Sequence, residues 1–160
     1  MLNTIINCLL VEDSDADALL FERALHQHAD LSVRVTRAAT LAAACHALTT
    51  SVMDVVVLDL NLPDSYGLAT FAAVKKTGGS IPVVILTGTG DMQFALEAIA
   101  AGASDFVNKD TMNGNMARAI GFSVARKAAR DSANESMVRW MRGVFGQLEE
   151  RIRRGEPDGE

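Results

Sequence analysis

Four apolar runs in this chain end on side chains whose chemistry suits a phosphoryl group. The end residues are an acidic pair, a single aspartate, a threonine and a lysine: Glu12 with Asp13, Asp59, Thr87 and Lys109. Carboxylates bind hard divalent cations, while hydroxyl and ammonium groups stabilise the oxygens of a transferring phosphoryl group. We therefore predict a site that combines a metal ion with phosphoryl chemistry.

The three acids define the metal and the nucleophile of this predicted site. Glu12, Asp13 and Asp59 would raise one another's pKa if they met without a cation between them. Mg²⁺ is the expected ion, because a few carboxylates leave coordination positions open for water and phosphoryl oxygens. Asp59 is then the expected nucleophile, and its product is an aspartyl phosphate.

Alternating sequence patterns predict the elements that bring these residues together. Predicted strands cover residues 5–11, 33–35, 54–58, 83–86 and 104–108, and predicted helices cover 15–28, 41–49, 68–76 and 92–101, with another from about 115. This alternation indicates an α/β fold with a flavodoxin-like, doubly wound, five-stranded parallel sheet in the order 2-1-3-4-5. In that order the strand ends that carry the reactive side chains meet at one edge.

Each of these residues has an ordinary structural role when it is taken alone. An aspartate after a strand usually caps a helix or shapes a turn, and a single lysine usually lies on the surface. The joint occurrence of all of them at four strand ends favours the functional interpretation.

Residues 3 to about 127 resemble the receiver domain of two-component response regulators, in particular its single-domain, chemotaxis-regulator-like members. Four stretches carry the resemblance: LLVEDS at 9–14, VLDLNLPD at 57–64 with Gly67, PVVILTG at 82–88 and AGASDFVNK at 101–109. The resemblance implies that Asp59 accepts a phosphoryl group from a histidine kinase or a histidine phosphotransfer protein. It also implies that Asp13, Asp59 and the backbone carbonyl of Asn61 bind Mg²⁺, with Glu12 assisting through water.

The same resemblance assigns roles to residues around the acceptor. Thr87 and Lys109 are expected to stabilise the phosphoryl oxygens, and Thr87 with Phe106 forms the expected switch pair. Asn61 and Thr89 occupy positions that tune how quickly the aspartyl phosphate hydrolyses in this family. The resulting signal is expected to switch a contact with a downstream protein target or to continue along a phosphorelay.

One position departs from the family pattern. Many receivers have a proline after the lysine, joined by a cis bond, and this chain has Asp110 there. We expect a trans bond and a more adaptable loop, because cis bonds are rare without proline.

Composition places the chain among cytoplasmic proteins. Hydrophobic residues make up 49% and charged residues 22%, and no apolar run approaches the roughly 20 residues of a membrane-spanning helix. Cys8 and Cys45 lack metal-ligand spacing and are expected to be reduced thiols. We expect no membrane association.

The C-terminal part predicts a helical extension. We divide the chain into a receiver domain (1–130), an amphipathic helical extension (131–154) and a disordered tail (155–160). The extension is too short for the usual DNA-binding output domain, and its basic residues are those of a solvated helix face, so we expect no nucleic-acid binding. Its apolar stripe comprises Met137, Met141, Val144, Leu148 and Ile152, flanked by Trp140 and Phe145. This stripe predicts packing of residues 134–153 on the receiver itself, on a protein partner or in a homodimer. A homodimer could form through this helix or through the face of the fourth helix, fifth strand and fifth helix.

Two alternative functions remain open from sequence. A receiver-like scaffold that works without phosphorylation usually lacks one of the acids, the threonine or the lysine, and this chain has them all. A haloacid-dehalogenase-like phosphatase places its nucleophile on the first strand with a second aspartate two residues later, whereas here Asn61 follows Asp59. We therefore expect no enzymatic activity beyond the protein's own phosphorylation and dephosphorylation, and no phosphoacceptor role for His26, His28 or His46.

Overall fold

The computed structural model describes residues 4–27 and 31–155. The chain forms two compact units, Met1–Ala125 and Arg126–Glu160, which are described separately below.

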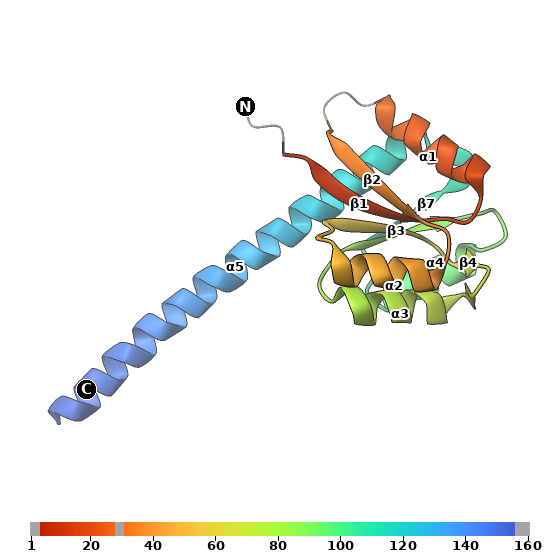
Figure 1. Cartoon of the computed structure of the whole chain (residues 1–160). Helices are drawn as coiled ribbons and strands as arrows, with labels where there is room; N and C mark the ends of the chain where they lie inside the picture. The colour runs from red at the N-terminus through yellow and green to blue at the C-terminus, as the bar shows by residue number, and fades with distance from the viewer. Residues whose placement is uncertain (1–3, 28–30, 156–160) are drawn as a thin grey trace. The chain divides into compact units, whose positions relative to one another are not determined.

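The first unit is built on a five-stranded parallel sheet (Figure 1). Its order is β2-β1-β3-β6-β7, which is the predicted 2-1-3-4-5 arrangement. The strands are β1 (Ile6–Val11), β2 (Val33–Ala38), β3 (Val55–Asp59), β6 (Val83–Thr87) and β7 (Asp105–Asn108). All four neighbouring pairs are parallel, so the reactive strand ends share one edge.

Within the described residues, five α-helices and one short 3-10 helix connect or follow the strands. They are α1 (Asp15–His26), α2 (Leu41–Thr50), α3 (Leu68–Gly78), α4 (Met92–Ala100), η1 (Lys109–Thr111) and α5 (Asn113–Arg154). The Ser14 side chain caps α1 by accepting a hydrogen bond from the Asp17 amide, as the sequence predicts. The predicted end of this helix, His28, falls outside the described residues.

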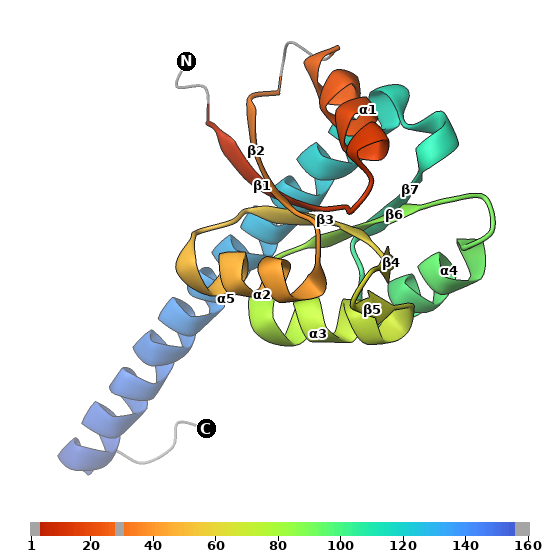
Figure 2. The ribbon, with the colours of Figure 1, turned by 45° about the vertical axis from the view of Figure 1, so that its right-hand side comes forward.

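Alternate side chains along the central strands pack into two separate hydrophobic cores, one on each face of the sheet. Cys8 and Leu10 face α1 and the start of α5, where Phe21 is fully buried. Leu9 and Val11 face the opposite layer of α2, α3 and α4 (Figure 2). Every residue of β3 is buried, because this strand is covered on both faces.

Two local features differ from the predicted elements. Strand β2 extends to Ala38, beyond the predicted end at Val35, and its pairing with β1 continues to Val11. The predicted loop after β3 contains a small hairpin of β4 (Asn61–Leu62) and β5 (Ser65–Tyr66). Its turn carries Pro63 and Asp64, residue types that favour tight turns.

The second unit contains the remainder of α5, which continues through Gly143 and Gly146 to Arg154. The large apolar side chains on this segment that are exposed include Met137, Val138, Trp140, Met141, Phe145 and Ile152. Among the helices of the described part of the chain, none combines the length and hydropathy that a membrane crossing requires. Of the predicted disordered tail, residues 156–160 fall outside the described residues.

Candidate functional site

Three carboxylates meet at the carboxyl edge of the sheet. Oxygen atoms of Glu12, Asp13 and Asp59 all lie within 4.8 Å of one another. Glu12 and Asp13 follow β1, and Asp59 ends β3, the neighbouring strand. Glu12 is 0% exposed and Asp59 is 7% exposed, whereas Asp13 opens to solvent. The parallel pairing therefore brings together the acidic group that the sequence predicts.

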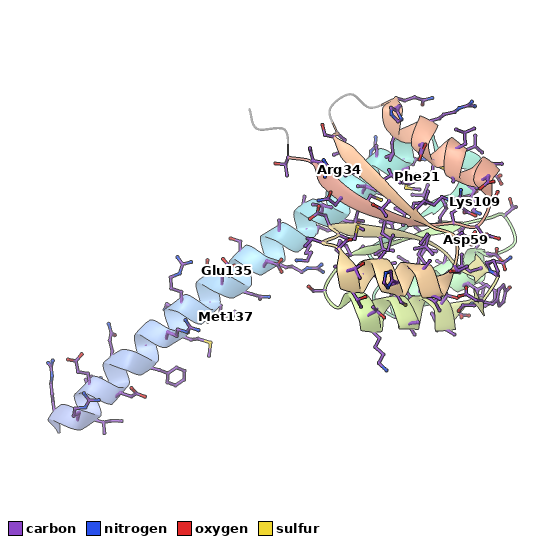
Figure 3. The ribbon with its side chains drawn as sticks, in the orientation of Figure 1. Phe21, Arg34, Asp59, Lys109, Glu135 and Met137 are labelled. Carbon is purple, nitrogen blue, oxygen red and sulfur yellow. The ribbon has the colours of Figure 1, made fainter. Side chains whose placement is uncertain are left out.

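Lys109 is the positive charge of this site (Figure 3). Its Nζ atom lies 2.8 Å from Glu12 Oε2, from Asp17 Oδ2 and from Asp59 Oδ2. Burial disfavours the charged ammonium, but its interactions with the three nearby carboxylates outweigh burial and raise the pKa of Lys109 above its ordinary value. The lysine is therefore charged at neutral pH and acts as the counter-ion of the acidic group.

Glu12 is the most constrained of the acids. Burial raises the pKa of its carboxyl group to about 7, against the opposing effects of Lys109 and the Ser14 amide. Oε1 accepts a hydrogen bond of 3.0 Å from the Ser14 amide. Oε2 is close to the Lys109 ammonium but has no hydrogen bond of good geometry.

The donor set fits a hard divalent cation. It consists of oxygen atoms on three converging carboxylates, and one buried oxygen, Glu12 Oε2, still lacks a well-directed partner. Mg²⁺ accepts such a partial oxygen shell and fills the rest with water or phosphoryl oxygens.

Three more predicted site residues, Asn61, Thr87 and Phe106, lie on β4, β6 and β7. The Asn61 amide donates a hydrogen bond of 2.8 Å to Asp59 Oδ1. Thr87 is buried at the end of β6, and its hydroxyl donates to the Gly88 carbonyl over 3.2 Å. Phe106 is half-buried against the core beneath α4. The predicted roles of the Asn61 carbonyl, and of Thr87 with Phe106 as a switch, remain predictions.

The peptide bond between Lys109 and Asp110 is trans, as predicted, since no cis bond occurs in the described residues. The Asp110 carboxylate accepts a hydrogen bond from the Thr89 hydroxyl, which joins the loops after β6 and β7.

Sequence reasoning missed two residues that contact the site. Asp17 binds Lys109 from the first turn of α1. The available signal was its position in the first turn of the predicted helix, four residues after Asp13. The Arg37 side chain, on the edge strand β2, donates hydrogen bonds to the backbone carbonyls of Glu12 and Asp13. This contact depends on the register in which β2 pairs with β1.

Asp64 connects the acceptor loop to α2. Its Oδ1 accepts the Leu41 amide over 2.8 Å, and its Oδ2 accepts the Ala42 amide over 3.0 Å. These two backbone hydrogen bonds lower the pKa of the Asp64 carboxyl group. The carboxylate thus satisfies two amides at the N-terminus of the helix, which favours negative charge.

The response regulator receiver domain family matches residues 8–121, a segment that contains the site and all of the sheet except the first two residues of β1. The chain belongs to this family. Its receiver domain has the fold expected from the resemblance, with the predicted acidic residues, threonine and lysine at or next to the strand ends.

Known relatives share this domain. The luminescence regulatory protein LuxO of Vibrio campbellii is 32% identical over 100 residues, which are 62% of this chain and 21% of the relative. The transcriptional regulatory protein PhoP of Escherichia coli is 33% identical over 101 residues, which are 63% of this chain and 44% of PhoP.

A solved receiver structure also matches the fold. The N-terminal signal receiver domain of a two-component response regulator from Bacteroides fragilis has a TM-score of 0.67 and 25% identity, covering 76% of this chain and 98% of that chain. The matched segment is thus a whole receiver domain, while it spans about a fifth of LuxO and less than half of PhoP.

Proposed function

We propose that Asp59 accepts a phosphoryl group from a histidine kinase or a histidine phosphotransfer protein in a Mg²⁺-dependent reaction. The observation that carries this proposal is the contact of 2.8 Å between Lys109 Nζ and Asp59 Oδ2 beside the acidic group of Glu12 and Asp13. The carboxylate is fixed at the end of a buried strand, and a cation already neutralises it there.

The transfer requires one bond to form and one to break. An Asp59 carboxylate oxygen attacks the phosphorus of the donor phosphohistidine, the O–P bond forms and the P–N bond breaks, and the leaving imidazole nitrogen retains the electron pair. Asp13, Asp59, the Asn61 carbonyl and, through water, Glu12 would hold Mg²⁺, which when bound neutralises charge on the phosphoryl oxygens. Lys109 supplies a fixed positive charge, and Thr87 supplies a hydroxyl donor for those oxygens.

Phosphorylation then changes the affinity for a protein target or feeds a phosphorelay. Thr87 and Phe106 form the proposed switch pair, since the first lies at the reacting edge and the second lies half-buried on the adjacent strand β7. The change in the free energy of partner binding is limited by how differently the partner binds the two receiver states. The protein works in the cytoplasm and catalyses only its own phosphorylation and dephosphorylation.

The helical second unit is proposed to associate with the same segment of a second copy. Trp140 is 68% exposed and Phe145 is 58% exposed, and the two flank the apolar stripe of α5. A large apolar stripe is rarely left solvated in soluble proteins. The same stripe on another copy is self-complementary under a two-fold axis, so a helical dimer covers both stripes at once.

The test of the phosphorylation proposal is direct. The full chain is incubated with acetyl phosphate, with and without Mg²⁺, and its intact mass is measured. A mass gain of one phosphoryl group is expected only with Mg²⁺, and Asp59→Asn is expected to abolish it. Labelling that persists in Asp59→Asn, or that maps to a histidine, would show that the acceptor is wrong.

A further inference from the structure

Arg37 makes three hydrogen bonds to the loop that carries the acidic pair. Its Nε donates to the Glu12 carbonyl over 3.0 Å, and one terminal nitrogen donates to the Asp13 carbonyl over 3.1 Å. The other terminal nitrogen donates to Asp15 Oδ1 over 2.7 Å. One guanidinium group therefore holds the backbone of both acids and the first residue of α1.

The end of β2 fixes this loop from both directions. The Glu12 amide donates to the Ala38 carbonyl over 3.0 Å, and the Glu12 carbonyl accepts from Arg37. Both polar backbone groups at Glu12 are thus bound by two consecutive residues of the neighbouring strand. The planar, rigid donor fork of arginine matches this arrangement, whereas the compact ammonium group of lysine lacks the fork.

The charge of Arg37 and its hydrogen bonds have opposite expected effects on Mg²⁺ binding. A guanidinium group near converging carboxylates repels a divalent cation, so its charge alone weakens metal binding. Its hydrogen bonds instead restrict the loop to the conformation in which Glu12 and Asp13 converge with Asp59, which favours metal binding. The side chain is partly exposed, at 32%, so solvent reduces the repulsion.

We infer that Arg37 is a positioning residue for the Mg²⁺ site, holding the backbone of the acidic pair in the metal-binding conformation. The inference rests on the proposed function, because it assumes that this site binds Mg²⁺. It assigns to the edge strand β2 a role in the chemistry at the centre of the sheet.

The experiment measures Mg²⁺ affinity by calorimetry on the unphosphorylated full chain. Arg37→Met removes the charge and the donors, while Arg37→Lys keeps the charge and removes the fork. Both variants are expected to bind Mg²⁺ roughly 10- to 100-fold more weakly, the usual cost of losing a group that orients metal ligands. Arg34→Met is the matched control, since Arg34 is exposed on the same strand and pairs with Asn7, at the opposite end of β1 from the acids (Figure 3).

Unchanged or tighter Mg²⁺ binding by Arg37→Met and Arg37→Lys would overturn the inference. Thermal unfolding of each variant identifies any loss of fold, and Arg37→Lys alone decides the question if Arg37→Met does not fold. Asp13→Ala distinguishes the two proposals. If the Asp13→Ala variant loses the Mg²⁺ binding seen by calorimetry in the wild type, while the Arg37 variants keep it, only the positioning role fails. If the wild-type signal is absent or survives Asp13→Ala, the proposed metal site fails and the inference fails with it.

Discussion

The Thr89 hydroxyl donates a hydrogen bond to the Asp110 carboxylate over 2.5 Å. Thr89 lies two residues after Thr87, and Asp110 follows Lys109, so the bond joins the segments that follow the two proposed phosphoryl-stabilising residues. Both residues are exposed. Asp110 stands where many receivers have proline, so this chain joins the loops through a side chain that also brings a negative charge.

That charge is expected to slow labelling by anionic phosphodonors. Asp110→Asn keeps an acceptor for Thr89 and removes the charge, and should increase the initial rate with acetyl phosphate by roughly two- to fivefold at low salt. The gain should shrink as ionic strength rises, because exposed charges are screened. The rates are measured by stopping the reaction at successive times and determining the intact mass of the protein.

Thr89→Val provides the complementary variant, because it breaks the hydrogen bond and leaves the charge in place. It should not reproduce the gain in rate. Glu22→Gln, on the exposed side of α1, controls for the loss of any one negative charge. An equal gain in Glu22→Gln would indicate a general charge effect with no special role for Asp110.

Lys109 is expected to compete with Mg²⁺. Its ammonium group forms ion pairs with Glu12 Oε2 and Asp59 Oδ2, two oxygens that could bind the metal. Lys109→Met should therefore strengthen Mg²⁺ binding by about three- to tenfold and weaken phosphorylation. Thermal shift titrations with Mg²⁺ measure the first effect, and acetyl phosphate labelling measures the second. Lys76→Met, on the exposed surface of α3, should change neither. Weaker Mg²⁺ binding by Lys109→Met would contradict the competition.

The two thiols should differ in reactivity. Cys8 is 0% exposed and burial raises the pKa of its thiol to about 12, so the reactive thiolate is almost absent near neutral pH. Cys45 is half-buried and accepts a hydrogen bond from Thr77. Iodoacetamide should therefore modify Cys45 in the folded protein and Cys8 only after unfolding. In Cys45→Ser, native labelling should disappear, and persistent labelling would show that Cys8 is accessible.

The apolar stripe of α5 should control the oligomeric state. Deleting residues 134–160, or replacing both Trp140 and Phe145 by glutamate, should convert a dimer into a monomer in sedimentation experiments, because charged residues on the stripe oppose its burial. Asp59 phosphorylation should persist in both proteins. Ser136→Glu, also on the exposed surface, is the control. Identical sedimentation of the wild-type and substituted proteins would show that the stripe does not mediate self-association.

The sequence predicted the sheet and the acidic edge well, since β3 and β6 are apolar runs that stop abruptly at Asp59 and Thr87. In a parallel sheet the strand order alone then places these ends together. The contacts of Asp17 and Arg37 could not be predicted in the same way. The first depends on how α1 is rotated over the sheet, and the second on the register and length of β2, whose weak alternation leaves its end undefined.

The complete burial of β3 has a consequence for the order in which the protein loses structure. Amide hydrogens of this central strand should exchange with solvent most slowly, whereas those of the partly exposed edge strand β2 should exchange sooner. Asp59 therefore belongs to the slowest-exchanging part of the domain, while Arg37 belongs to one of the faster. Mild denaturant or moderate heating should therefore weaken Mg²⁺ binding at the proposed site before it unfolds β3.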